Sequence, residues 1–265
     1  MKMLLVITTF LFVVPAHACM DRQVRFGFYA SFKPVSYSSG TGAHLGYEAD
    51  LLTALEAVSG GRLSFSRQGI TAWKDIWLRP AGPDLDMAGG GITILESRTR
   101  DRAGRRAIVF TAGHIEFRQS LLVRREDAGR LARYEDLGGQ DKVGVMPGTT
   151  GEARFLELTA GARPRVVQLP DETALIKALA AGRIDAVAGA DTGNRFASRE
   201  SKGALVVTAL DRQVEKGGFA LAARHAALAA CLNRHIAHVT GSGRIGYAEW
   251  LDDPEVFIRQ ARKGR

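Results

Sequence analysis

Apolar and polar residues follow two rhythms along the chain, and these rhythms predict alternating strands and helices. Between Tyr47 and Val58, apolar residues recur at positions 47, 51, 52, 55 and 58, which is the spacing of an amphipathic helix. Short runs rich in β-branched and aromatic residues predict strands before and after it, at 24–29 and 62–67. A strand, a helix and a second strand in this order indicate a parallel sheet covered by helices.

A second block of the same kind follows, which predicts a second lobe. Its expected elements are a strand at 142–146, a helix at Thr150–Leu158, a strand at 165–169, a helix at 172–181 and a strand at 184–188. Further helices are predicted at 73–78, 127–136, Ala226–Val239 and 247–260, the last with a break at Pro254. The pattern therefore predicts an α/β chain whose two lobes are each built on a mostly parallel sheet.

The first residues have the composition of a cleaved signal peptide. Lys2 precedes an apolar run at 3–14, and Ala16-His17-Ala18 supplies a small-x-small cleavage site. The run is too short to span a bilayer comfortably. We therefore expect residues 1–18 to direct export to the periplasm. Cleavage after Ala18 would leave Cys19 first; a lipid anchor on Cys19 is the less favoured alternative, because Ala16 stands where lipoproteins usually carry leucine.

Charge and cysteine content narrow the class of protein. The chain carries 36 Lys and Arg against 28 Asp and Glu, a net charge of +8 that falls to about +7 without Lys2. The basic residues are spread out, except at 98–106, and are not interleaved with aromatic residues as in a nucleic-acid site. The two cysteines, Cys19 and Cys231, fit an oxidising compartment. A disulfide between them and an unpaired, buried Cys231 are equally open.

The stretch 84–99 contains the first candidate site. Gly89, Gly90 and Gly91 follow a short apolar segment, and three adjacent glycines let the backbone approach another group closely. Thr93 and Arg98 follow with a hydroxyl group and a forked cation. Bare amides, a hydroxyl group and a guanidinium suit a small carboxylate. A glycine-rich loop with a solvated arginine is the alternative.

Two more candidates lie in the second block. Pro147-Gly148 ends a strand, and Thr149 and Thr150 open a helix whose free N–H groups favour a carboxylate or a phosphate. Helix capping explains these threonines equally well. Asp191 stands just past the carboxyl end of a buried strand, where open α/β sheets place ligands, so its carboxylate suits an ammonium group. Its alternative role is also a helix cap.

The sequence contains no motif for a metal site, a nucleotide-binding site or a catalytic nucleophile. His235 and His238 lie three residues apart on a helix, but no further ligand accompanies them, so neither a metal nor another cofactor is expected. The chain has no phosphate-binding loop motif, dinucleotide fingerprint or nucleophile elbow.

The order of these motifs resembles family 3 periplasmic solute-binding proteins over nearly all of the chain after the leader. The matching segments are Phe32-Lys33-Pro34-Val35-Ser36-Tyr37, Gly46-Tyr47-Glu48-Ala49-Asp50-Leu51, Trp73, Gly91-Ile92-Thr93-Ile94 with Arg98, Gly148-Thr149-Thr150, and Gly182-Arg183-Ile184-Asp185-Ala186 with Asp191. The resemblance implies two lobes joined by two crossings, with the ligand in the cleft between them. Residues 19–114 plus 213–265 would form lobe 1, and 115–212 lobe 2.

The same resemblance implies roles for the candidate residues. Arg98 would hold the α-carboxylate of an amino acid, helped by the turn at Gly91 and Thr93. The other lobe would add Thr149 and Thr150 as donors and Asp191 as the partner of the α-ammonium, while Tyr37 and Trp73 would wall the side-chain pocket. A monomer that delivers its ligand to an inner-membrane ABC permease is expected.

A second resemblance is to exported cyclohexadienyl dehydratases, which act on prephenate or arogenate and share this fold. Pro147-Gly148-Thr149-Thr150-Gly151-Glu152 and Glu215-Lys216 are similar to their segments. In that reading Glu152 would be the general acid, provided that it holds its proton. The lysine that these enzymes place after the first crossing is not found here, so binding is favoured over catalysis. A sensor lobe for a signalling partner is a third alternative.

Overall fold

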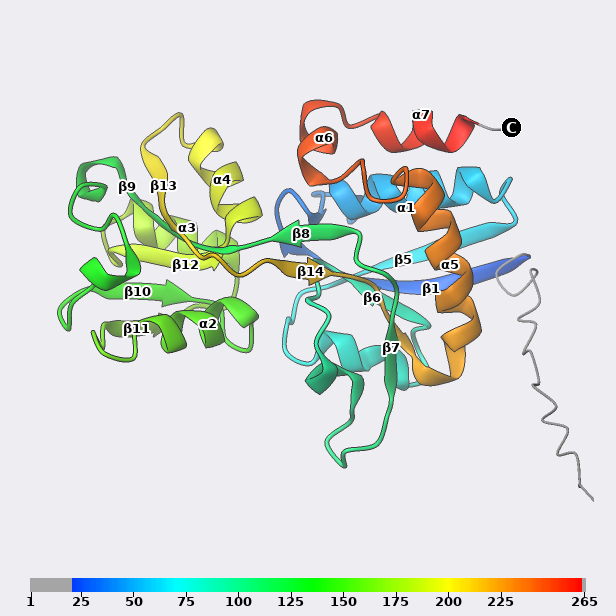
Figure 1. Cartoon of the computed structure of the whole chain (residues 1–265), viewed down its shortest axis with the longest axis horizontal. Helices are drawn as coiled ribbons and strands as arrows, with labels where there is room; N and C mark the ends of the chain where they lie inside the picture. The colour runs from blue at the N-terminus through cyan, green and yellow to red at the C-terminus, as the bar shows by residue number, and fades with distance from the viewer. Residues whose placement is uncertain (1–20, 264–265) are drawn as a thin grey trace, which may run out of the picture.

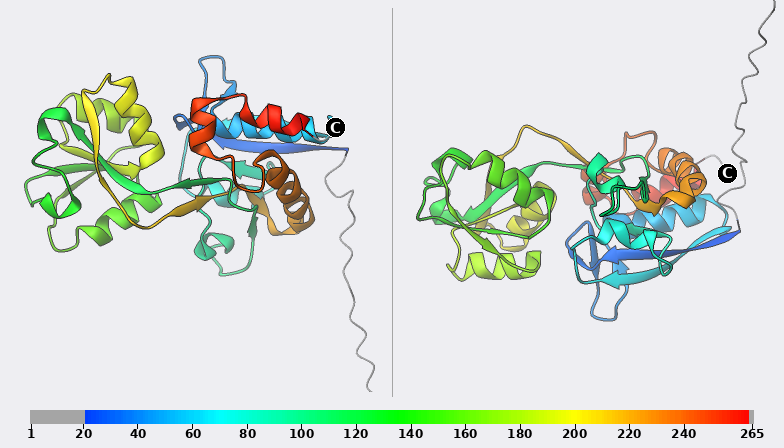
Figure 2. Two further views of the ribbon diagram at one scale, coloured as in Figure 1. Left: turned by 45° about the horizontal axis from the view of Figure 1, so that its top comes forward. Right: turned by 90° about the horizontal axis from the view of Figure 1, so that it is seen from below.

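The computed structural model describes residues 21–263, which form two lobes that lie side by side and are joined by a pair of crossing strands (Figure 1). The predicted leader and Cys19 lie outside the described residues. Figure 2 shows from two further directions that the lobes are separate α/β units.

Lobe 1 is built on a five-stranded sheet in the order β5-β1-β6-β15-β7. The first three strands are parallel, and β15 is antiparallel to both of its neighbours. The long helices α1 and α5 pack against the sheet, and the C-terminal α6 and α7 lie over α1 (Figure 1). The elements are β1 (Arg22–Tyr29), α1 (Tyr47–Val58), β5 (Leu63–Ile70), β6 (Met87–Gly89), β7 (Ile108–Phe110), β15 (Ala220–Ala222), α5 (Ala226–Val239), α6 (Tyr247–Asp252) and α7 (Val256–Arg262).

Lobe 2 repeats this strand plan in the order β11-β10-β12-β9-β13. Again three parallel strands are followed by one that runs antiparallel to both neighbours. Its elements are β9 (Gln119–Arg124), β10 (Lys142–Val145), α2 (Thr150–Leu158), β11 (Arg165–Gln168), α3 (Glu172–Ala180), β12 (Ala186–Ala190), α4 (Asp191–Glu200) and β13 (Leu205–Leu210).

The chain passes between the lobes twice. The crossing strands β8 (Ile115–Phe117) and β14 (Glu215–Gly217) pair antiparallel to each other (Figure 1). A small sheet of β2 (Ser31–Phe32), β3 (Ser36–Ser38) and β4 (His44–Leu45) follows β1 at the end of lobe 1 that faces lobe 2. Within residues 21–263, no helix has both the length and the apolar character that crossing a membrane requires.

The predicted fold class is confirmed, and several elements begin and end where the sequence pattern placed them. The helix at Tyr47–Val58 is one of them, because Leu51, Leu52 and Leu55 recur on its buried face. The predicted helix at 127–136 is wrong. Short 3₁₀ turns stand there instead, at Arg125–Asp127 and Tyr134–Asp136. Only two buried apolar side chains, Leu131 and Tyr134, anchor this segment, which is too few to hold a helical face against the lobe.

Two further helices differ in extent. The short helix expected at 73–78 is a 3₁₀ turn at Ile76–Ala81, which includes Pro80. The C-terminal helix expected at 247–260 is divided into α6 and α7, and the break falls at the predicted proline. Proline cannot donate the backbone hydrogen bond that a continuous helix needs at that point.

Candidate ligand-binding cleft

A cleft of about 350 Å³ lies between the lobes, and both contribute to its walls. It is formed where parallel strands of the two sheets end, which is where open α/β sheets bind ligands. Its size suits a small molecule. The lining residues used below are Ser31, Phe32, Trp73, Gly91 and Thr93 of lobe 1, and Gln119, Met146, Thr149, Thr150, Gly151, Glu172 and Asn194 of lobe 2.

A buried carboxylate binds the backbone of Gly90 and Gly91, the turn after β6 that is called the glycine corner below. Glu48, fully buried at the start of α1, accepts hydrogen bonds from the amides of Gly90 (2.6 Å) and Gly91 (2.9 Å). Both glycines have positive φ angles, of 120° and 71°, which favour glycine. His114 Nε2 lies 3.2 Å from the same carboxylate. The amide of Gly91, which the sequence pattern suggested as a donor to a ligand, is therefore engaged by Glu48 inside lobe 1.

Arg98 lies behind Thr93 and is almost completely buried. Its Nη1 donates to the backbone oxygen of Thr93 (3.1 Å), and its Cζ is 4.3 Å from the ring centre of Trp77 and 6.0 Å from that of Trp73. Burial lowers the pKa of the Arg98 guanidinium to about 10, although the nearby Glu215 carboxylate opposes this effect. Arg98 therefore remains a cation at neutral pH and lies next to two residues of the cleft wall, Trp73 and Thr93.

Across the cleft, α2 begins with unpaired backbone donors. The Thr149 side chain accepts from Glu152 N, and the Thr149 carbonyl accepts from Ala153 N. The amides of Thr150 and Gly151 precede these in the first turn, where no intrahelical acceptor exists. The Thr150 hydroxyl lies 3.2 Å from the Thr93 hydroxyl of lobe 1. The structure thus brings together Gly91, Thr93, Thr149, Thr150 and Trp73 at one cleft, with Arg98 directly behind them.

Glu215, on the crossing strand β14, orients two cleft residues: Thr93, which the sequence pattern predicted, and Gln119, which it did not assign. It accepts from the Thr93 hydroxyl (2.9 Å) and from Gln119 Nε2 (2.6 Å). Because a carboxylate only accepts, the amide nitrogen of Gln119 must face Glu215. The buried Gln119 Oε1 has no partner among residues 21–263 and lies beside Gly151. Since Gln119 lines the cleft, this oxygen is a ready acceptor for a ligand N–H group.

Three predicted residues do not reach the cleft. The Asp191 carboxylate accepts from Arg118 N (2.9 Å) and Arg195 Nε (3.3 Å), and its neighbour Ala190 lines the cleft instead. Tyr37, on β3, has the Lys33 ammonium 5.3 Å from its ring centre, and it is Phe32 on β2 that lines the wall. Glu152 accepts from Gly148 N (2.8 Å) and Gln168 Nε2 (2.5 Å), away from the cleft-lining residues.

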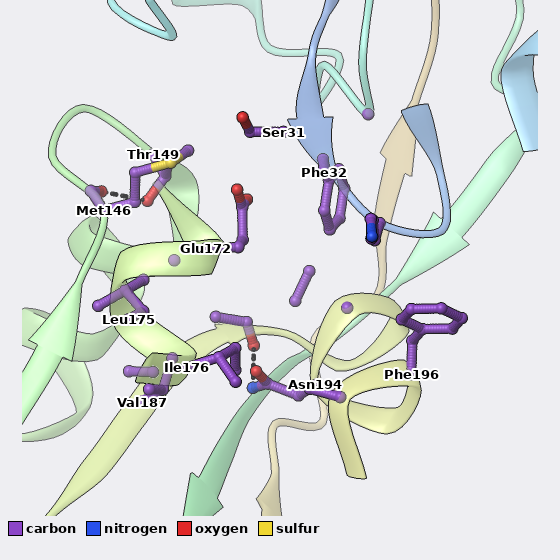
Figure 3. Close-up of a pocket in the computed structure, with 18 of the residues that line it drawn as sticks. Ser31, Phe32, Met146, Thr149, Glu172, Leu175, Ile176, Val187, Asn194 and Phe196 are labelled. Atoms are coloured by element: carbon purple, nitrogen blue, oxygen red, sulfur yellow. Dashed lines mark hydrogen bonds between the residues drawn. The ribbon is translucent and has the colours of Figure 1, made fainter. Parts of the chain in front are cut away.

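Glu172 is a second cleft residue that the sequence patterns did not single out. It opens α3 and points into the gap toward lobe 1 (Figure 3). Burial is the main cause that raises the pKa of its carboxyl group to about 8, and the neighbouring Asp171 carboxylate adds to it. Its position directly after β11 was a usable signal, because the carboxyl end of that parallel strand faces the same edge as Thr149.

No group of three or more His, Cys, Asp and Glu side chains within residues 21–263 is arranged to hold a metal ion. The cleft offers hydrogen-bond donors and acceptors, the charged side chains of its lining, among them Glu172, and the Arg98 guanidinium directly behind Thr93.

Comparison with known proteins identifies the family. The model of the bacterial extracellular solute-binding proteins, family 3, matches residues 24–252. The chain belongs to this family. The resemblance of its motifs to solute-binding proteins is thereby confirmed.

Relatives of this family 3 protein show what similar chains bind. A probable histidine-binding protein of Neisseria gonorrhoeae is 26% identical over 216 residues, which cover 81% of this chain and 76% of that protein. An arginine-bound, truncated arginine-binding protein of T. maritima has a TM-score of 0.68 at 22% identity, covering 81% of this chain and 94% of that one. An ancestral amino-acid-binding protein, a precursor of cyclohexadienyl dehydratase, has a TM-score of 0.70 at 22% identity, covering 91% and 94%. The two structures share the fold of this chain.

Proposed function

We propose that this solute-binding protein captures an amino acid in the interlobe cleft after export to the periplasm and delivers it to an ABC-type permease of the inner membrane. The observation that carries the proposal is the pairing of Arg98 and Thr93 in lobe 1 with the open amides of Thr150 and Gly151 in lobe 2. A cation and a helix N-terminus that face one cleft suit a carboxylate from both sides.

The Arg98 guanidinium has donors to spare for such a carboxylate. It forms no ion pair within residues 21–263, and its one hydrogen bond there uses Nη1 alone. An arginine carries five N–H donors in a fixed fork. A ligand carboxylate between Arg98 and α2 would contact both lobes, so that its binding free energy favours the closed arrangement.

For the ligand ammonium, Gln119 Oε1 is the acceptor that the geometry favours, because the Asp191 carboxylate is engaged by Arg118 N and Arg195. We expect Gln119→Leu to weaken amino-acid binding by about 10-fold or more, since a charged hydrogen bond contributes roughly 1.5–3 kcal/mol. Asp191→Asn should change affinity less than about 3-fold. Calorimetry on both variants checks this. A large loss in Asp191→Asn alone, with folding intact, would return the role to Asp191.

Calorimetry with the twenty common amino acids tests the proposed function, and incubation with prephenate tests catalysis as its rival. We expect saturable binding of at least one amino acid at one site per chain. We expect no phenylpyruvate from prephenate, because Glu152 is bonded to Gly148 N and Gln168 outside the cleft. Turnover of prephenate that Glu152→Gln abolishes would establish the dehydratase instead.

A further inference from the structure

Glu172 is an acid in the cleft wall without a cationic partner. The other charged side chains that line the cleft are Lys33, Lys177 and Glu200. Among residues 21–263, Glu172 forms no ion pair, and its side-chain partner is the Tyr29 hydroxyl at 3.5 Å, the long limit of a hydrogen bond. Figure 3 shows its carboxyl group pointing across the gap toward Ser31 of β2.

Packed aromatic side chains connect Arg98 with Glu172. The Arg98 Cζ is 6.0 Å from the Trp73 ring centre, and the Trp73 ring meets the Tyr29 ring edge-on at 5.2 Å. The Tyr29 hydroxyl then reaches Glu172 of lobe 2. Trp73 lines the cleft and Tyr29 is buried behind the lining residues. The cleft is therefore bipolar, with a cation behind Trp73 and Thr93 at one end and the Glu172 carboxyl group at the other.

Partial burial disfavours the ionised form of a carboxyl group and raises its pKa, unless a nearby cation stabilises the negative charge. The raised pKa of Glu172 reflects this situation, because no positive group of the described chain is near enough to oppose it. A ligand cation placed against Glu172 would supply the missing charge.

We propose that Glu172 is the specificity-determining residue of the cleft and selects amino acids with a cationic side chain. This inference rests on the proposed function. The ligand would lie with its carboxylate toward Arg98 and the start of α2, and with its guanidinium or ammonium group between Glu172 of lobe 2 and Ser31 of lobe 1. Contacts from lobe 1 and lobe 2 would then flank both ends of the ligand.

The test compares arginine with citrulline, in which a neutral urea group replaces the guanidinium at nearly the same size. We expect the wild-type chain to prefer arginine over citrulline by about 10- to 100-fold, as removal of a charged hydrogen bond implies. Glu172→Gln should remove most of this preference by weakening arginine binding while citrulline binding changes little. Glu157→Gln is the matched control, because Glu157 is an exposed acid of lobe 2 that does not line the cleft, and it should keep the preference.

The pH dependence gives a second readout. Arginine binding would favour ionised Glu172, so its affinity should rise with pH from 6 to about 8, by at most about 10-fold per unit, and then level off. The titratable neighbours of Glu172 are Tyr29 and Asp171; Tyr29 stays neutral because burial and these carboxylates raise its pKa. Lys33, Lys177 and Glu200 also line the cleft and titrate. The rise of arginine affinity with pH is therefore assigned to Glu172 only if Glu172→Gln abolishes it.

Each outcome decides one claim. Equal affinity of the wild-type chain for arginine and citrulline would overturn the selection of cations while leaving amino-acid binding intact. Equal losses for both ligands in a folded Glu172→Gln variant would make Glu172 a structural residue and overturn the inference as well. Absence of binding for every amino acid would instead defeat the proposed function.

Discussion

Arg98→Ala is expected to weaken amino-acid binding by at least about 100-fold. The guanidinium is buried behind Thr93, whose hydroxyl lies 3.2 Å from the Thr150 hydroxyl of lobe 2. Truncation removes a charge-assisted, two-pronged contact and leaves a buried ligand carboxylate without its partner, which costs several kcal/mol. Calorimetry with the preferred amino acid measures the loss.

Two controls make the Arg98 result interpretable. Arg98→Lys keeps a positive charge without the planar fork and should give an intermediate loss. Arg102→Ala removes an exposed arginine that pairs with Asp75, and its affinity should match the wild-type value. Thermal unfolding of each variant checks that the packing of Arg98 on Trp77 is not the cause. Unchanged affinity in a folded Arg98→Ala variant would remove Arg98 from the binding site.

Glu48→Gln is expected to destabilise the protein by about 3 kcal/mol, and so to lower Tm by roughly 6–12 °C. Both carboxylate oxygens of Glu48 accept amides, from Gly90 and from Gly91, and an amide side chain can offer only one oxygen to them. The amide nitrogen would face a backbone N–H group at a fully buried position.

The matched control is Glu157→Gln on α2, whose side chain is 69% exposed. We expect its Tm to change by less than about 2 °C, because surface ion pairs contribute little. Calorimetric unfolding of the two variants and the wild type provides the comparison. A Glu48→Gln variant as stable as the wild type would mean that the glycine corner does not depend on this carboxylate.

The sequence was informative where periodicity and glycine boundaries agreed. α1 shows this best: Leu51, Leu52 and Leu55 repeat at helical spacing, and Gly46 and Gly60 flank the segment. The positions of Thr93 and Thr150 at the cleft were also predictable, because each follows a strand end in its own lobe, where open α/β sheets place ligands. These are local signals with one dominant physical cause.

Asp191 shows why other site residues were not predictable. Side chains at the end of a strand alternate between faces, so one residue decides whether a group enters the cleft. Ala190 lines the cleft, and Asp191 begins α4 with its carboxylate on Arg118 N. Gln119 and Glu215 were missed because their roles arise from a contact between residues 96 positions apart, which no local pattern encodes.

The central claim is that the ligand lies in the cleft between the lobes, against Trp73. The chain has three tryptophans, so Trp77→Phe/Trp250→Phe leaves Trp73 as the only one. Titration of this variant with the amino acid that calorimetry selects measures the cleft alone. We predict a saturable change in Trp73 emission that matches the calorimetric affinity at one ligand per chain. Calorimetric binding with unchanged Trp73 emission would place the ligand elsewhere and contradict the account.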